Sequence, residues 1–183
     1  SSNNNYKITI VSFEKSKNHL HNKELILNKL EKNNIEWIPL KYTKRPPIFS
    51  TIWDIYKLRK SVNKLKNKGL DLIHCRSYIT TLVALGVKKT HNIPFIFDMR
   101  GFYADERVDG RIWNLNNIIY KKIYNYFKLK EKEFLQSSGY TISLTETGKK
   151  EIVSWNLPNQ SKIKVIPCCT DENLFQKKNI QNV

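Results

Sequence analysis

The order of apolar runs and amphipathic segments is the feature that most constrains how this chain folds. Six short runs rich in β-branched and aromatic residues have the character of strands, and segments with helical spacing separate them. Strands separated by helices predict parallel βαβ units with right-handed crossovers. We therefore expect an α/β fold with an open, doubly wound, mostly parallel sheet of about six or seven strands.

The expected elements are set by residue spacing and by the glycines and prolines between them. The expected strands are Tyr6–Phe13, Ile35–Tyr42, Leu70–Cys75, Ile93–Asp98, Thr141–Leu144 and Lys162–Ile166. The expected helices are His21–Lys32, a segment from a cap at Ser50 or Thr51 to Lys68, Tyr78–His91, Leu115–Ser137 and Glu146–Trp155. Residues 99–114 are expected to be irregular. Pro39 predicts an edge position for the second strand, and the third and fourth runs lack alternation, which is typical of central strands.

The charge of the chain is strongly positive. Its 183 residues include 32 Lys and Arg against 16 Asp and Glu, a formal net charge of +16. Such an excess indicates partners that carry negative charge, namely nucleic acid, an anionic membrane surface or a phosphorylated small molecule. The chain also has 26 Lys, 20 Asn and 21 Ile, which indicates a compositional bias of the source genome. Part of the net charge then reflects that bias, so charge alone does not select the partner.

Several classes of protein and of site are not expected. Apolar residues are 40% and charged residues 26% of the chain, which argues against wholesale disorder. The longest mostly apolar stretch, Tyr78–Val87, is about half of a spanning helix, and Ser1–Asn5 does not resemble an export signal. No G-x-G-x-x-G or Walker sequence occurs, and Cys75, Cys168 and Cys169 lack metal-ligand spacing. We expect reduced thiols in the cytosol, no metal site and no tightly bound cofactor.

Ligands of an open parallel sheet bind at the carboxyl ends of its strands. This rule selects five loops, which are Ser12–His19, Arg76–Tyr78, Met99–Arg111, Thr145–Thr147 and Cys168–Asp171. The loop after the fourth strand is the richest, because three of the six arginines lie there among carboxylates. Arginine forks match phosphate or carboxylate groups, and carboxylates orient those forks or bind sugar hydroxyls. The alternative is a salt-bridged, solvated surface loop.

Two further features also have two interpretations each. Arg76–Tyr78 precedes a helix whose N-terminus favours an anion, but Ser77 is equally suited to capping that helix. Two helices carry basic runs and suit either an anionic lipid surface or plain solvation. The basic residues are Lys57, Arg59, Lys60, Lys64, Lys66 and Lys68 on one helix and Lys121, Lys122, Lys128, Lys130 and Lys132 on the other, which also carries Tyr120, Tyr124 and Tyr126.

Three segments carry a resemblance to a known family. They are DLIHCRSYITTLVALGV (Asp71–Val87), IPFIFDMRGFYADERVDGRIW (Ile93–Trp113) and KIKVIPCCTDENLF (Lys162–Phe175). They resemble glycosyltransferase family 4, and more closely its bacterial polysaccharide or exopolysaccharide type. The resemblance covers nearly the whole chain and is firmest over residues 70–175.

The resemblance implies a GT-B fold, in which two Rossmann-like domains face each other across a cleft. Such enzymes transfer a sugar from a nucleotide-sugar to an acceptor with retention and without a metal. The N-terminal domain binds mainly the acceptor, which for this type is a glycan or lipid-linked molecule of the cell envelope. The chain resembles that N-terminal half. Residues 1–175 are expected to form it, and 176–183 are expected to be a polar tail towards a missing donor-binding domain, so the fragment alone is expected to be inactive.

The resemblance also implies roles for individual residues. Asp98 and Arg100 are the candidate catalytic residues. The candidate acceptor-binding residues are Arg76, Ser77, Tyr78, Gly101, Asp105, Glu106 and Arg107, and the candidate cleft-lining residues are Ser12, Glu14, His19, Thr145 and Glu146. The sequence departs from the family at three places: it lacks the Gly-Gly pair after the first strand, has Arg100–Gly101 in place of His-Asp, and has Cys168–Cys169 in place of Asn-Gly.

The leading hypothesis is the acceptor-side domain of a cytoplasmic sugar transferase that works at the inner face of a membrane. Its substrates are a nucleotide-sugar and a glycan or lipid-linked acceptor, and nucleic acid is not expected as a partner. A basic nucleic-acid-binding module is an alternative that net charge favours but no recognised motif supports. Another alternative is a non-catalytic partner subunit of a split glycosyltransferase.

Overall fold

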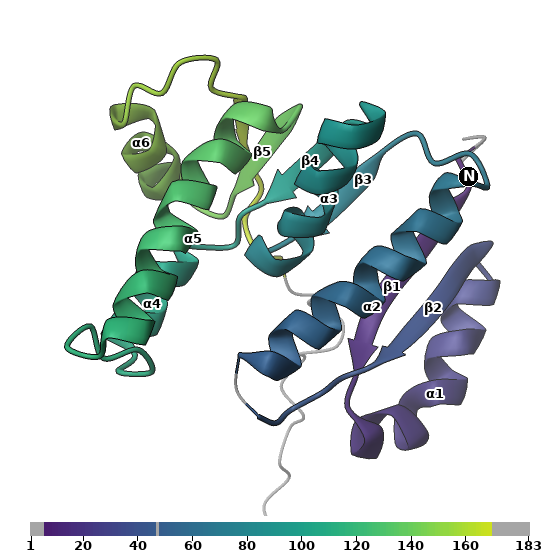
Figure 1. Ribbon diagram of the computed structural model, residues 1–183. Coiled ribbons are helices and arrows are strands. Elements are labelled where there is room, and N and C mark those ends of the chain that lie inside the picture. The colour runs from purple at the N-terminus through teal and green to yellow at the C-terminus, as the bar shows by residue number, and fades with distance from the viewer. Residues whose placement is uncertain (1–5, 47, 170–183) are drawn as a thin grey trace, which may run out of the picture. The chain divides into compact units, whose positions relative to one another are not determined.

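The computed structural model describes residues 6–46 and 48–169, and it has the expected α/β class with parallel strands (Figure 1). The chain divides into two compact units, Ser1–Asp71 and Leu72–Val183, and each is described by itself. The six strands form a two-stranded sheet in the first unit and a four-stranded sheet in the second, and every pairing is parallel.

The first unit consists of β1 (Ile8–Glu14), α1 (Ser16–Glu31), β2 (Ile35–Lys41) and α2 (Phe49–Lys66). β1 and β2 pair in register from Ile8 opposite Ile35 to Glu14 opposite Lys41. The buried face of α2 repeats every four residues through Ser50, Asp54, Leu58 and Val62, as an amphipathic helix requires. Asp54 accepts a hydrogen bond from Thr43 N at 3.1 Å and pairs with Lys57 Nζ at 2.6 Å.

Two helix starts in the first unit differ from the sequence-based expectation. α1 begins at Ser16, five residues before the expected start at His21. α2 begins at Phe49, so Ser50 lies buried in its first turn, and the N-cap position belongs to Ile48, which makes no side-chain cap. Ser50 therefore faces the interior, because its place on the buried stripe of α2 outweighs its preference for a cap.

The second unit carries the four-stranded sheet in the order β3-β4-β5-β6. Its elements are β3 (Ile73–Arg76), α3 (Tyr78–His91), β4 (Phe95–Asp98), α4 (Tyr103–Asp109), α5 (Ile118–Ser137), β5 (Tyr140–Ser143), α6 (Glu146–Ser154) and β6 (Lys162–Val165). β4 is central and mostly buried, as expected. β3 is an end strand of this sheet, with His74 and Arg76 exposed, so the expectation of a central third strand is wrong for the sheet as described.

Aromatic rings fill the core of the second unit. Tyr78 is completely buried at the start of α3, and its ring meets Phe97 and Phe134 edge-on at centroid distances of 5.3 and 6.0 Å. Tyr103 stacks on the same ring at 5.3 Å and also meets Phe127 at 5.1 Å. Offset and edge-to-face pairs each contribute about 1 kcal/mol beyond their buried area. These contacts attach α3, α4 and α5 to the sheet.

A buried carboxylate lies beside this cluster. Glu131 on α5 is completely buried, and it accepts hydrogen bonds from the Tyr78 hydroxyl and from Lys128 Nζ, the latter at 2.6 Å. Lys128 Nζ also donates to Asp105 at 2.8 Å, and Tyr124 donates to the same carboxylate at 2.8 Å. Burial raises the pKa of Glu131, and the hydrogen bonds from Lys128 and Tyr78 offset part of that rise. This polar network ties α4 to α5.

The segment expected to be irregular contains a short helix. α4 spans Tyr103–Asp109 between Gly101 and Gly110, and its Ala104 is fully buried. The two glycines and the run of charges gave this segment the composition of a loop. α4 forms because its aromatic and aliphatic side chains pack on α5, which is a tertiary effect that local spacing does not reveal.

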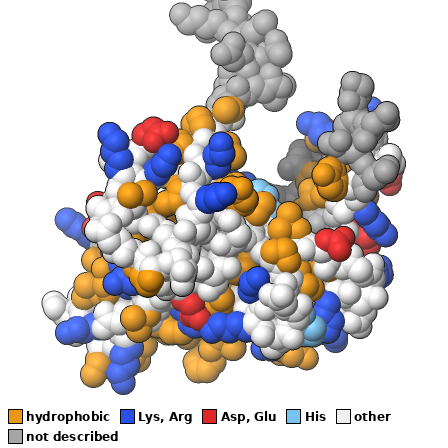
Figure 2. Space-filling model, turned by 90° about the horizontal axis from the view of Figure 1, so that it is seen from above, with side chains coloured by type: hydrophobic (Ala, Val, Ile, Leu, Met, Phe, Trp, Pro, Cys, Tyr) orange, Lys and Arg blue, Asp and Glu red, His pale blue; other side chains and the backbone are white. Residues whose placement is uncertain are grey.

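Positively charged side chains outnumber negatively charged ones on the surface (Figure 2). On the face drawn in Figure 2, Lys and Arg side chains are spread among hydrophobic ones and Asp and Glu are few.

Over residues 6–46 and 48–169, no helix combines the length and the hydropathy needed to cross a membrane.

The three cysteines should differ sharply in reactivity. Cys75 is buried on β3, and burial raises the pKa of its thiol to about 12, whereas Cys168 and Cys169 are exposed. Because the thiolate is the nucleophile, iodoacetamide near neutral pH should alkylate the exposed pair in the native chain and spare Cys75. Peptide mass spectrometry measures this, and adding denaturant should expose Cys75 to the reagent. Labelling of Cys75 in the native chain at the rate of the other two would contradict this burial.

Candidate functional site

The carboxyl ends of β3, β4, β5 and β6 lie side by side because the ladder of backbone hydrogen bonds continues past the strands. Ser77 N donates to Asp98 O at 2.8 Å, joining the exit of β3 to that of β4. Met99 N donates to Ile142 O at 3.0 Å, and Ile166 N donates to Ser143 O at 2.9 Å, which extends the ladder to β6. Four of the predicted site residues, Arg76, Ser77, Asp98 and Arg100, therefore share one edge of the sheet.

The backbone at this edge is strained at two adjacent exits. Ser77 has φ 71° and ψ 176°, a region that glycine occupies almost alone, and Arg100 has φ 62°. Gly101 comes next with φ 152°, and a Cβ there would collide with Glu106 Oε1. Glycine is favoured here by its backbone conformation, whereas the Glu106 carboxylate is the movable end of an exposed side chain. Residues held in such conformations cluster at functional sites.

Arg100 reaches across the edge towards the exit of β6. Its Nη2 donates to Cys168 Sγ at 3.0 Å, and Cys168 is exposed. The guanidinium retains further donors after this contact, since it carries five N–H groups in a planar fork. This contact directs the guanidinium along the carboxyl edge, where its remaining donors can bind a phosphate or a carboxylate.

Asp98 ends β4 with a carboxylate that is only partly satisfied. The residue is buried, and its Oδ1 has no hydrogen-bond partner among the residues that the structure describes. Its Oδ2 lies 3.8 Å from His74 Nε2, beyond hydrogen-bond distance. A buried acceptor without a donor costs about 1–3 kcal/mol, and such groups are rare in folded proteins.

The predicted site residues of α4 do not all face the same way: Asp105 faces α5, and Glu106 is exposed. Asp105 is bound to Tyr124 and Lys128 of α5, and the Arg107 guanidinium lies over the Tyr103 ring at 4.9 Å. Glu106 is exposed beside Gly101 at the start of the helix. Tyr78, predicted beside Ser77, directs its hydroxyl to Glu131 in the core. The role of these residues in acceptor binding stays a prediction.

The two helix caps that the sequence left open have different outcomes. Ser77 occupies the N-cap position of α3, but its hydroxyl accepts no hydrogen bond from the first turn. Thr145 caps α6, because its Oγ1 accepts a hydrogen bond from Gly148 N at 3.0 Å. Glu146 is the first residue of α6 and is exposed.

The remaining predicted residues belong to the first unit. Ser12 and Glu14 lie at the carboxyl end of β1, where the Ser12 hydroxyl donates to Glu14 Oε1 at 2.6 Å. The indole of Trp37 donates to Ser12 Oγ at 2.9 Å. The side chain of His19 lies outside the described part of α1, and Asp171 likewise lies outside the described residues.

Sequence reasoning missed the residues that support α4. Lys128 and Glu131 stand three residues apart on α5, a spacing that predicts an ion pair on a helix, but Lys128 was counted only as one of a basic run. Its ammonium also lies 5.1 Å from the centroid of Trp155. Burial of the pair against aromatic rings arises from packing and is not visible in the local sequence.

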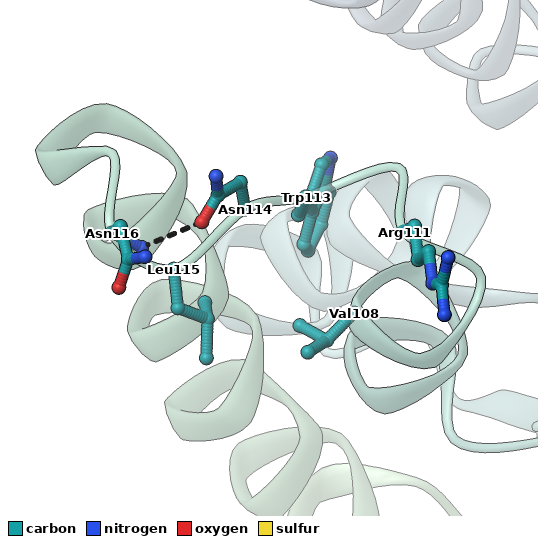
Figure 3. Close-up of a pocket in the computed structure, with 6 residues that line it drawn as sticks. All are labelled: Val108, Arg111, Trp113, Asn114, Leu115 and Asn116. Carbon is teal, nitrogen blue, oxygen red and sulfur yellow. Dashed lines mark hydrogen bonds between the residues drawn. The ribbon is translucent and has the colours of Figure 1, made fainter.

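A hollow of about 420 Å³ lies apart from this edge, in the connection between α4 and α5 (Figure 3). It is lined by Val108, Arg111, Trp113, Asn114, Leu115 and Asn116. Val108 and Arg111 belong to the loop Met99–Arg111 that the sequence selects, and the other four lie outside it. Asn116 N donates to Asn114 Oδ1 at 2.9 Å on its rim. Within the described ranges, no three His, Cys, Asp or Glu side chains converge as a metal site would require.

Comparison with known proteins provides the family. The sequence pattern of Glycosyltransferase Family 4 matches residues 2–174, which is nearly the whole chain. No curated protein matches the chain significantly. The matched range covers most of both units and all four strand exits of the candidate site. The α/β fold with parallel sheets agrees with this match, and the chain therefore belongs to Glycosyltransferase Family 4.

Proposed function

We propose that this chain is the acceptor-binding domain of a retaining glycosyltransferase in cell-surface polysaccharide synthesis. The donor is a nucleotide-sugar, and the acceptor is a glycan or a lipid-linked molecule at the inner face of a membrane. The family match supports sugar transfer, and the motifs at the exits of β3, β4 and β6 support the polysaccharide type. The nucleotide itself binds mainly to a donor domain beyond the residues described, and no metal takes part.

The strained backbone at Ser77 and Arg100 carries the proposal. Two non-glycine residues with positive φ stand at neighbouring strand exits, and each costs on the order of 1–3 kcal/mol. Such conformations persist only where the surrounding structure holds them, and they are frequent at active sites and ligand clamps. Their location at the carboxyl edge is where ligands of parallel sheets bind.

The chemistry of transfer assigns roles to the charged residues there. Breaking the bond between the sugar and the nucleotide leaves negative charge on a phosphate oxygen. The Arg100 fork is suited to stabilise that charge, or to orient the acceptor, and Arg76 lies on the neighbouring exit. The partly satisfied Asp98 carboxylate is suited to accept a hydrogen bond from a sugar hydroxyl, and Glu106, Ser77 and the Gly101 backbone frame the acceptor.

Replacement of Arg100 tests this site. In a glycosyltransferase that carries the chain, Arg100→Ala should lower kcat/KM for sugar transfer by about 100-fold or more, because a positioned donor to the leaving group is lost. Arg100→Lys should retain part of the activity, since it keeps the charge and loses the fork. Arg59→Ala, on the exposed face of α2, is the matched control and should leave transfer unchanged. Unchanged turnover and acceptor affinity in Arg100→Ala would remove Arg100 from the site.

Replacement of Ser77 separates strain from function. Ser77→Gly should raise the free energy of unfolding by about 1 kcal/mol, because glycine adopts this backbone conformation without strain. The same change should weaken acceptor binding, since it removes a side chain at the carboxyl edge. Chemical denaturation and acceptor titration measure the two effects. Ser61→Gly, inside α2, should instead lower stability, and a loss of stability in Ser77→Gly would argue against strain at this residue.

A further inference from the structure

The first half of α5 extends beyond the sheet at its carboxyl edge. α5 has 20 residues and is about 30 Å long, whereas each strand of this sheet has four residues and spans about 13 Å. The buried residues of α5 are Phe127, Glu131, Phe134 and Leu135, and none of them lies among its first nine residues. Figure 1 shows α4 and the first half of α5 projecting past the strand ends. The inner face of these early turns packs on the core through Ile123 and Tyr124, and the sheet does not cover their outer face.

Large apolar side chains are nevertheless exposed in these early turns, in the preceding connection, and at Leu129 just past the middle of α5. Ile118, Ile119 and Leu129 are 69%, 55% and 70% exposed, and Ile112 in the preceding connection is 53% exposed. Ile119, Tyr126 and Leu129 recur at helical spacing, so they lie along one stripe of α5. Isolated exposed apolar residues are common, but a stripe of this kind on a projecting element indicates an interaction surface.

The charge around this stripe has one sign. From residue 110 to residue 130 the chain contains five Lys and Arg and no Asp or Glu. Lys128 and Lys130 are paired with Asp105, Glu131 and Glu133. Arg111, Lys121 and Lys122 are exposed, and no carboxylate of the described residues pairs with them. We call the set Arg111, Ile112, Ile118, Ile119, Lys121, Lys122, Tyr126 and Leu129 the α5 tip.

The hollow beside the α5 tip adds an apolar recess with polar groups at its rim. In Figure 3, Val108, Trp113 and Leu115 surround the space, while Arg111, Asn114 and Asn116 supply charged and amide groups. Tryptophan and tyrosine favour the boundary between hydrocarbon and headgroups, because one end of each ring is apolar and the other bonds to water. Trp113, Tyr120 and Tyr126 supply such rings in this region.

We propose that the α5 tip docks the protein on an anionic lipid bilayer. The isoleucines and Leu129 enter the headgroup boundary, and Arg111, Lys121 and Lys122 bind the negative headgroups. Apolar burial and positive charge act together here, which a soluble acidic partner alone does not require. The docking itself does not depend on the proposed function. The consequence of docking rests on the proposed function. It would place the carboxyl edge with Arg100 on the membrane side, where a lipid-linked acceptor is held.

Vesicle binding by the 183-residue chain tests the docking without any turnover, so a failure of sugar transfer leaves it unaffected. Vesicles of phosphatidylcholine alone are compared with vesicles that also contain phosphatidylglycerol, in a sedimentation assay. The chain should sediment with the anionic vesicles, remain largely free with the neutral ones, and bind less at high salt. Equal partitioning on both kinds of vesicle would overturn the proposal.

Matched variants assign the binding to the α5 tip. Lys121→Glu with Lys122→Glu should lower the partition coefficient at least about tenfold, since each Lys or Arg near an anionic membrane surface adds to the binding free energy. Lys150→Glu with Lys162→Glu makes the same charge change at exposed positions of α6 and β6 and should have a much smaller effect. Equal losses in the two double variants would mean that net charge, and not the α5 tip, drives binding.

The apolar component needs its own variants. Ile119→Ser with Leu129→Ser keeps the charge and should still weaken vesicle binding, whereas Val153→Ser at an exposed position of α6 should not. Circular dichroism checks that each variant is folded. Two results would overturn the lipid assignment: duplex DNA bound through Lys121 and Lys122 in the absence of vesicle binding, or dimerisation of the chain that Ile119→Ser with Leu129→Ser abolishes.

Discussion

The buried carboxylate of Glu131 is the interaction on which the second unit depends. A charge without water is tolerated only with donors close by, and Glu131 has two, the Tyr78 hydroxyl and the Lys128 ammonium. Tyr78 is the first residue of α3, directly after the strained Ser77. Lys128 also holds Asp105 on α4, the helix that comes after Arg100 and Gly101. One network thus anchors the helix after each of the two strained exits, which explains how the strain persists.

The network also separates two aspartates that look alike in the sequence. Asp98 and Asp105 stand seven residues apart in the same segment, and both were candidates for the site. Asp105 has its hydrogen bonds supplied by Tyr124 and Lys128, which makes it a support for α4. Asp98 retains a buried oxygen without a donor at the carboxyl edge, among the residues that the structure describes. The chemistry proposed for sugar transfer therefore rests on Asp98 and Arg100, with Asp105 behind them.

The positive charges of the chain also divide into paired and unpaired groups. Several lysines that looked like part of a uniform basic surface form ion pairs, among them Lys57 with Asp54 and Lys89 with Glu133. The more exposed pair, Lys89 with Glu133, contributes little to stability, but both pairs remove their lysines from the charge available to a partner. The bases of the α5 tip have no such pairs within the described part of the chain and lie among exposed isoleucines. Charge becomes informative about a partner only when pairing and apolar exposure are considered together.

The sequence by itself determined the fold class, the order of the elements and the family, because strand and helix spacing and the long motif after β4 are local properties. It also predicted the strand exits as the place of the candidate site, since parallel strands put their carboxyl ends together. Only the tertiary structure decided that residues 103–109 form a helix, that β3 ends its sheet and that Lys128 is a support. The reason is distance along the chain: Tyr78 meets Glu131 53 residues away, and Asp105 meets Lys128 23 residues away, so these roles exist only once the helices have packed.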